Sequence, residues 1–202
     1  MMYQTIRLEY YTKQKQAWPK EGKHILAQYD ADSVIVYQAY RPAIGLFAVE
    51  NQYFGGEFSL NRMSWIKPNF LWMMYRSNWA RTPGQEIVCG VRLKRDFFDE
   101  VVRTAVPSSF DKTRYKDQTE WKRAVKRSSV RLQWDPDHGP SGNKCERRAI
   151  QLGLRGDILE QYSRDAIIEI INMTPFIQNQ ISHLAQHYNG LLTPEESIYP
   201  LP

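Results

Sequence analysis

The sequence contains few cysteines and no long apolar segment. Its 202 residues include only two cysteines, Cys89 and Cys145, which lie far apart and form no CxxC pair. We therefore expect neither a disulfide framework nor a zinc knuckle. The first 23 residues, MMYQTIRLEYYTKQKQAWPKEGK, hold no apolar run of signal-peptide length, and no window approaches the roughly 20 apolar residues of a membrane-spanning helix. These absences predict a cytoplasmic protein without a membrane partner.

Common catalytic motifs are missing as well. The sequence has no P-loop and no GxGxxG, and the FGGEF at 54–58 is too short to indicate phosphate binding by itself. The HLAQH at 183–187 places two histidines four residues apart, but Leu184 occupies the position where a metallopeptidase has glutamate. A polar helix face explains this spacing more simply, so we expect no metal.

Basic residues are concentrated in one part of the chain. The net charge of the chain is +5. Residues 112–148 contain 11 Lys or Arg and 5 Asp or Glu, so this segment alone has a net charge of +6. Such a local field favours phosphate-rich partners, although a solvated positive surface accounts for it equally well. The candidate nucleic-acid-binding residues are Arg62, Lys122, Arg123, Lys126, Arg127 and Arg131.

Residue periodicity predicts an α+β fold with a mixed or antiparallel sheet and flanking helices. Alternating, β-branched and aromatic residues indicate strands at 33–40, 86–93, 129–134 and 147–154. The last two are compatible with a hairpin across the turn that begins at Asp135. Prolines, acidic first turns and apolar spacing indicate helices at 42–52, 68–76, 96–105 and 118–128.

We expect one domain over residues 1–202, with an N-terminal arm at 1–24 and a C-terminal helix pair at 155–190. Ile158, Tyr162, Ile167 and Ile171 have helical spacing and predict that the first helix of the pair runs through all of them. The second helix is expected to begin at Thr174 and Pro175.

The segment WIKPNFLWMMYRSNWARTPGQE, at 65–86, combines three tryptophans with three cations. If its centre is helical, one side faces the core, and the other gathers Trp72, Tyr75, Arg76 and Trp79 beside Lys67. Aromatic rings stack on bases, and lysines near helix N-termini favour anions. An aromatic core with a charged rim is the alternative, and the sequence alone leaves both open.

Two further groups are candidates for chemistry. The strand at 33–40 delivers Gln38, Tyr40 and Arg41 to one end of the sheet, where polar side chains often line a cleft. Glu86 stands just before a strand, and Asp135 just after one, where carboxylates are held in place and can act as acid or base. A strand cap and ordinary turn chemistry are the structural alternatives for these two carboxylates.

Several long segments together resemble one protein family. They are ILAQYD, IVYQAY followed by PAI, RMSWIKPNFLWMMYRSNWA followed by PGQE, VRLQWDPD and RRAIQLGL. These segments extend from residue 25 to the C-terminal tail and resemble the domain of unknown function 4291 family. The resemblance implies kinship and brings no activity with it.

A second resemblance, of layout only, is to ADP-ribosyltransferases, which are small mixed α/β domains that bind NAD. It implies that Glu86 would stabilise an oxocarbenium-like sugar, that Arg41 or Arg76 would hold the pyrophosphate, and that Tyr75 or Trp79 would stack. Gln38 departs from this layout, because it stands where that family would place Arg or His. Such an analogy of layout does not by itself define a function.

The expected function is therefore a nucleotide- or nucleic-acid-directed enzyme, with ADP-ribosyl transfer from NAD as its most specific form. An RNA- or DNA-binding module without NAD chemistry and a protein-interaction domain are the alternatives. The candidate catalytic residues are Glu86, Arg41 and Asp135. The residues expected to bind a nucleotide such as NAD are Tyr37, Gln38, Tyr40, Lys67, Trp72, Tyr75, Arg76 and Trp79.

Overall fold

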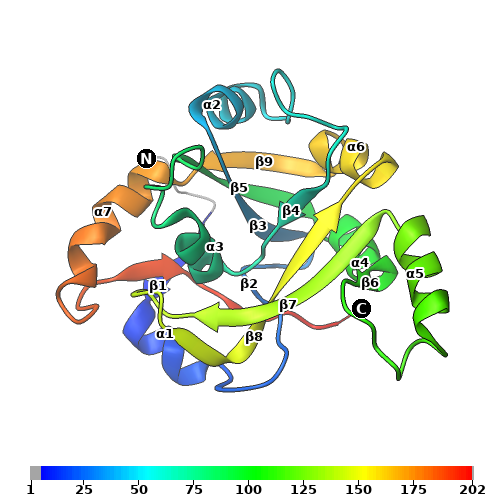
Figure 1. Cartoon of the computed structure of the whole chain (residues 1–202). Helices are drawn as coiled ribbons and strands as arrows, with labels where there is room; N and C mark the ends of the chain where they lie inside the picture. Colours follow the sequence, from blue (N-terminus) through cyan, green and yellow to red (C-terminus); the bar gives the residue numbers. More distant parts are fainter. Residues whose placement is uncertain (1–5, 202) are drawn as a thin grey trace.

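The computed structural model describes residues 6–201, and the first five residues of the expected N-terminal arm lie outside this range. Two sheets form the centre of the molecule (Figure 1). The first is antiparallel, and the second is mixed because its edge pair β6–β7 is parallel. In order, the first contains β3 (Ser33–Tyr40), β5 (Ile87–Lys94) and β9 (Ile167–Asn172), and the second β4 (Ser64–Ile66), β8 (Lys144–Leu154), β7 (Val130–His138) and β6 (Val106–Pro107).

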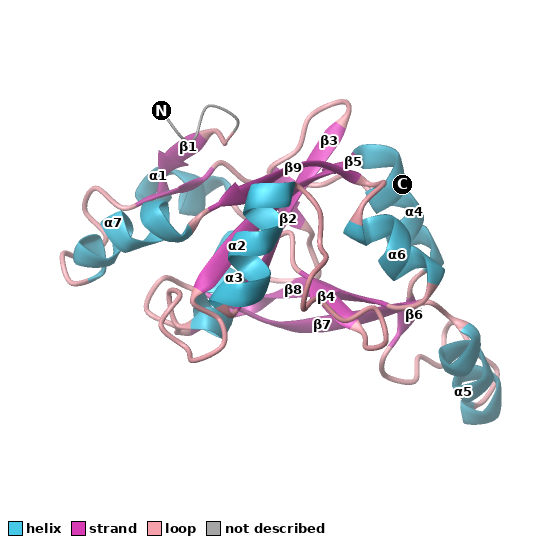
Figure 2. Ribbon diagram, turned by 90° about the horizontal axis from the view of Figure 1, so that it is seen from above, coloured by secondary structure: helices cyan, strands magenta, loops and turns pink. Residues whose placement is uncertain are grey.

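The two sheets meet where β3 passes the end of β4. Tyr37 and Lys67 form a bridge there, with the Tyr37 nitrogen 2.7 Å from the Lys67 carbonyl oxygen. Seen from above, the sheets lie in two layers that converge at this point (Figure 2). This junction positions the cleft described below.

Two further strand pairs attach both ends of the described chain to the body. They join segments more than 160 residues apart in sequence, because Leu8 pairs with Pro194 and Leu26 with Ile198. Trp18 is also buried in the core, so the segment that contains it packs on the body. The pairs are β1 (Leu8–Tyr10) with β10 (Leu192–Pro194) and β2 (Leu26–Ala27) with β11 (Ser197–Ile198).

The helices surround these sheets, and α5 lies at the periphery in both views (Figures 1 and 2). Their starts follow capping chemistry: Pro42 opens α2, and the Asn69 and Asp117 side chains accept backbone N–H groups at the starts of α3 and α5. The helices are α1 (Tyr11–Ala17), α2 (Pro42–Asn51), α3 (Phe70–Ser77), α4 (Arg95–Thr104), α5 (Gln118–Arg127), α6 (Asp157–Ser163) and α7 (Thr174–Leu184).

The core forms two clusters around the antiparallel sheet. Side chains alternate across β3, so Val34 and Val36 enter one cluster, and Ile35 and Tyr37 enter the other. The first cluster fills the space between the sheets, and the second packs beneath α3 and α7. No helix within residues 6–201 combines the length and apolar character needed to cross a bilayer.

The α+β architecture and the predicted hairpin are confirmed, since β7 and β8 pair antiparallel. The predicted C-terminal helix pair is wrong in its first member: α6 ends at Ser163, and Ile167 begins β9. The run Ile-Ile-Glu-Ile-Ile is rich in β-branched residues, and β5 offers it a free edge. Helix α3 also begins two residues later than predicted, because Asn69, not Pro68, provides its cap.

Candidate functional site

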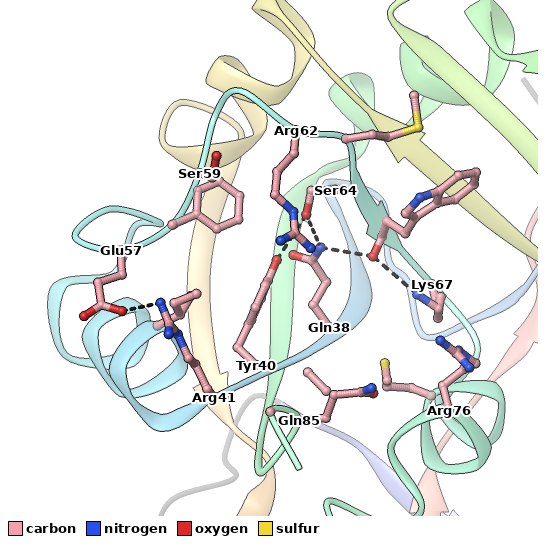
Figure 3. Close-up of a pocket in the computed structure, with 17 residues that line it drawn as sticks. Gln38, Tyr40, Arg41, Glu57, Ser59, Arg62, Ser64, Lys67, Arg76 and Gln85 are labelled. Atoms are coloured by element: carbon pink, nitrogen blue, oxygen red, sulfur yellow. Dashed lines mark hydrogen bonds and ion pairs between the residues drawn. The ribbon is translucent and has the colours of Figure 1, made fainter. Parts of the chain in front are cut away.

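A cleft of about 600 Å³ opens at the junction of the two sheets. The end of β3, the start of β4, the loop at 52–63 and one side of α3 surround it (Figure 3). Its lining residues are Gln38, Ala39, Tyr40, Arg41, Ile44, Glu57, Phe58, Ser59, Arg62, Met63, Ser64, Trp65, Lys67, Met73, Arg76, Gly84 and Gln85.

A chain of hydrogen bonds fixes the polar floor of the cleft. The buried Tyr162 hydroxyl donates to Gln38 Oε1 at 2.5 Å. Gln38 Nε2 in turn donates to Ser64 Oγ at 2.8 Å and to the Trp65 carbonyl oxygen at 3.0 Å. Gln38 therefore joins β3 to β4 and has its amide groups engaged, so its role here is to position Ser64.

The two hydroxyl groups beside Gln38 leave one proton unused. Tyr40 and Ser64 share a hydrogen bond of 3.1 Å in which either can donate. The bond accepted from Gln38 uses no hydroxyl proton, so among the described residues only one of the two hydroxyl protons has an acceptor, in the bond between Tyr40 and Ser64. The other proton is available to a ligand. Burial raises the pKa of the Tyr40 hydroxyl far above its ordinary value, so this group stays a donor.

Lys67 is the most unusual charge in the cleft. The residue is 7% exposed, and its Nζ contacts the Trp65 carbonyl oxygen at 3.4 Å. Among the described residues no carboxylate lies within ion-pair distance of Nζ. Burial, together with the nearby Arg76, lowers the pKa of Lys67 to about 8, and Asp135 opposes this shift. A buried cation without a counter-ion is costly, and a bound anion would relieve that cost.

Three arginines add to this positive field. Arg76 comes from α3 and Arg62 from the loop at 52–63, and both reach the cleft (Figure 3). Arg41 lies at the opposite rim, where it forms an ion pair with Glu57. Glu57 is the only carboxylate among the described lining residues, so the cleft combines four cations with one acid.

Aromatic side chains form part of the cleft wall. Tyr40 packs against Phe58 and Phe54, with ring centroids 6.0 Å and 5.6 Å apart, and Trp65 lines the other side. Flat apolar walls beside cations are the combination that holds a ring-bearing phosphate compound.

The structure brings together six of the residues that sequence patterns singled out. Gln38, Tyr40, Arg41, Arg62, Lys67 and Arg76 all line the cleft. They come from separate elements, and the close approach of β3 to β4 brings these elements around one cleft.

Apart from Tyr40, the aromatic residues predicted to bind the nucleotide lie outside the cleft lining. Tyr37 is fully buried on the opposite face of β3 and packs on Phe70. Trp79 is buried in the same cluster, and its Nε1 donates to the Pro140 carbonyl at 3.1 Å. Most of the tryptophan surface in residues 65–86 is thus core.

Trp72 and Tyr75 form a stack outside the cleft lining. Both rings lie nearly parallel to His138, and the Tyr75 and His138 centroids are 3.5 Å apart. Trp72 is buried, whereas Tyr75 is 42% exposed. These residues support the α3 surface that carries Arg76.

The two carboxylates predicted to be catalytic do not line the cleft. Glu86 Oε1 accepts from the backbone N–H of Gly84 at 2.8 Å, next to the lining residue Gln85. Asp135 accepts from Gln133 and Gln151 at 2.8 and 2.6 Å, on β7 and β8. Both are held by neighbours, and Asp135 acts on the cleft through its charge on Lys67.

The basic residues of α5 form a separate surface. Lys122, Arg123, Lys126 and Arg127 are exposed, and none of them lines the cleft. Arg131 has a structural contact instead, because its guanidinium donates to the carbonyl groups of Val125 and Ser128 at the end of α5. Such a contact fits the favourable placement of cations at helix C-termini.

Sequence patterns missed Ser64, Trp65, Glu57 and Tyr162. Ser64 and Trp65 belong to a three-residue strand, which is too short to show a period. Tyr162 reaches Gln38 from 124 residues away, so no local pattern reveals this contact.

Comparison with known families identifies the family to which the chain belongs. Residues 24–199 match the family described as domain of unknown function 4291, and the chain belongs to this family. Among curated proteins no relative matches the chain.

Proposed function

We propose that this protein acts on nucleotides or nucleic acids and that the cleft holds the phosphate of the ligand. The observation that carries the proposal is Lys67: a buried lysine that faces the cleft, has no carboxylate partner among the described residues, and is flanked by Arg62 and Arg76. Cation clusters of this kind recognise phosphate. The neighbouring aromatic walls suit a nucleoside.

ADP-ribosyl transfer from NAD is the most specific form of this proposal. NAD has a pyrophosphate, which suits the cleft arginines Arg62 and Arg76, and two ring systems, which suit the aromatic residues of the cleft wall. Glu86 is its proposed catalytic carboxylate, and it lies one residue from the lining residue Gln85. Under this form of the proposal, Glu86→Gln abolishes turnover of NAD and leaves the melting temperature unchanged.

The first test is the melting temperature of the full chain in the presence of NAD, ATP or a short single-stranded RNA. A ligand at about 100 times its dissociation constant adds roughly 2.7 kcal/mol of stability if it binds only the folded state. The shift should disappear in Arg76→Gln, which removes a cleft cation at an exposed position. It should persist in Lys122→Gln, which removes an exposed cation of α5. Equal shifts in both variants would refute binding in the cleft.

RNA or DNA binding without nucleotide chemistry is the second candidate, and the surface of α5 favours it. Within residues 6–201 no carboxylate forms an ion pair with Lys122, Arg123, Lys126 or Arg127. Four free cations on one short helix provide a phosphate-binding surface. If this candidate holds, replacing all four with Gln reduces the dependence of RNA affinity on salt, and Arg76→Gln does so less.

A further inference from the structure

The amine of Lys67 has an environment that suits a second role. It faces the cleft, it is shielded from bulk water, and its one hydrogen bond to a described residue is the long contact to the Trp65 carbonyl. Lysines that serve only as phosphate ligands gain from full exposure to the anion, whereas a shielded amine beside a second cation is the arrangement that makes lysine nucleophilic.

The electrostatics of the cleft point the same way. Burial and Arg76 lower the pKa of Lys67 to about 8. Near neutral pH, its free-amine fraction is therefore more than roughly two orders of magnitude above that of an ordinary lysine. Arginine side chains are generally always charged in proteins, so the cleft can hold a phosphate through Arg62 and Arg76 while the lysine is neutral.

A proton donor also faces the same space. The Tyr40–Ser64 pair retains one hydroxyl proton that has no acceptor within residues 6–201. Both residues line the cleft together with Lys67. An amine and a nearby hydroxyl are the two groups that imine formation requires, because water must leave from the intermediate.

We propose that Lys67 forms an imine with the open-chain aldehyde of a phosphorylated pentose. The Lys67 nitrogen attacks the aldehyde carbon, and the carbonyl oxygen takes up a proton. The resulting carbinolamine then loses that oxygen as water, with the hydroxyl pair as proton donor and a nitrogen-bound proton released, to leave a C=N bond. Arg62 and Arg76 would hold the phosphate.

This inference rests on the proposed function for its phosphate site and adds the reactive group of the substrate. Such an aldehyde occurs in a free pentose phosphate and at an abasic site of a nucleic acid. Both present the open-chain aldehyde of a pentose close to a phosphate, as a monoester in the free sugar and as a diester at the abasic site, and the probes used below separate the two sources.

The experiment is reductive trapping on the full chain. The protein is incubated with ribose 5-phosphate, or with an oligonucleotide that contains one abasic site, and then treated with borohydride. Borohydride delivers hydride to the imine carbon, and solvent supplies a proton to the nitrogen. The adduct therefore adds the mass of the aldehyde less one oxygen atom, and peptide mass spectrometry locates it.

We expect the adduct at Lys67 to exceed that at any exposed lysine by at least roughly tenfold. Lys67→Arg keeps the charge and should abolish the adduct, whereas Lys20→Arg, at an exposed lysine outside the cleft and outside α5, should retain it. If Lys67→Arg does not fold, peptide mapping of the trapped wild-type protein still shows whether the adduct is at Lys67. A preference for one probe identifies free sugar phosphate or nucleic acid as the source.

Labelling spread over exposed lysines, or equal labelling by ribose and ribose 5-phosphate, would overturn the inference. A melting-temperature rise with nucleotides but no adduct at Lys67 would also overturn it, and would leave the proposed function intact. An adduct at Lys67 without any melting-temperature rise with nucleotides would support imine formation and would contradict the proposed nucleotide function.

Discussion

At the scale of one residue, the proposed phosphate binding should depend on pH through Lys67. Its pKa is about 8, lowered by burial and Arg76 and raised by Asp135. The amine is charged below this pH and neutral above it, so affinity for a nucleotide should fall as pH rises from 7 to 9. Arginine side chains keep their charge in proteins generally, so a pH dependence in this range would come from the lysine. Isothermal titration with a nucleoside diphosphate measures this dependence.

Lys67→Met serves as the control for this pH effect. The variant keeps the length of the buried side chain and removes the amine. Its affinity should be lower at pH 7 and unchanged between pH 7 and 9. A variant with the same pH profile as the unmodified protein would show that Lys67 does not contact the anion.

Glu57 should weaken anion binding, because it neutralises Arg41 at the rim. Glu57→Gln should raise nucleotide affinity by roughly two- to fivefold, which corresponds to the modest energy of an exposed ion pair. The gain should shrink at high salt. Glu100→Gln breaks the exposed pair with Arg103 on α4, outside the cleft, and should leave affinity unchanged. Weaker binding in Glu57→Gln would indicate that Glu57 contacts the ligand directly.

At the scale of elements, the cap of α3 stabilises the helix that carries the cleft residue Arg76. Asn69 Oδ1 accepts the Trp72 N–H at 2.7 Å, and Arg76 lies on the same helix. Asn69→Ala should lower the free energy of unfolding by about 1 kcal/mol or more, since the residue is buried and also contacts Glu196. Chemical denaturation measures this loss, and nucleotide affinity should fall with it.

Asp117→Ala is the matched cap variant on α5. Asp117 accepts the Glu120 N–H at 2.8 Å, but α5 has no buried residue. This variant should cost less stability and should not change nucleotide binding. Equal effects of both variants on affinity would refute the proposed role of α3.

The elements also show which predictions were possible from sequence. Strand β3 and helix α2 matched expectation because a β-branched run ends at Pro42, and both signals are local. Strand β9 was missed because its isoleucines satisfy a helical spacing as well as a strand, and only the free edge of β5 decides between them. Local preference gives way to tertiary context in such segments.

The cleft was predictable only in part for the same reason. Lys67, Arg76 and Arg41 stood out through their charge beside aromatic residues. The side of α3 that faces the core could not be read from the sequence, because apolar and aromatic residues occupy both sides. Packing of α3 against β3 and against His138 on β7 placed Trp72 and Trp79 inside and left Arg76 in the cleft.

At the scale of the whole molecule, Glu196 makes stability depend on pH. Its carboxylate is 5% exposed and accepts the Phe70 N–H at 2.6 Å, which joins the C-terminal segment to α3. Burial raises the pKa of this carboxyl well above its ordinary value, so the folded state favours the protonated form. The free energy of unfolding should therefore fall as pH rises above about 4.5, the ordinary value for glutamate.

Glu196→Gln should remove this part of the pH dependence. Urea unfolding at pH 5, 6, 7 and 8 should show the variant gaining stability relative to the unmodified protein at each step. Glu195→Gln changes the neighbouring, exposed carboxylate and should leave the profile unchanged. A constant difference between Glu196→Gln and the unmodified protein at every pH would contradict a raised pKa.

The pairing of β1 with β10 and of β2 with β11 has a consequence for synthesis on the ribosome. Residues 8–27 find their strand partners at 192–198, so these contacts cannot form until residues 192–198 have left the ribosome. Closing so long a loop is slow compared with forming local hairpins. The nascent chain can complete the β7–β8 hairpin before that point. Strands β1 and β2 must stay unpaired, and accessible to chaperones, until β10 and β11 emerge.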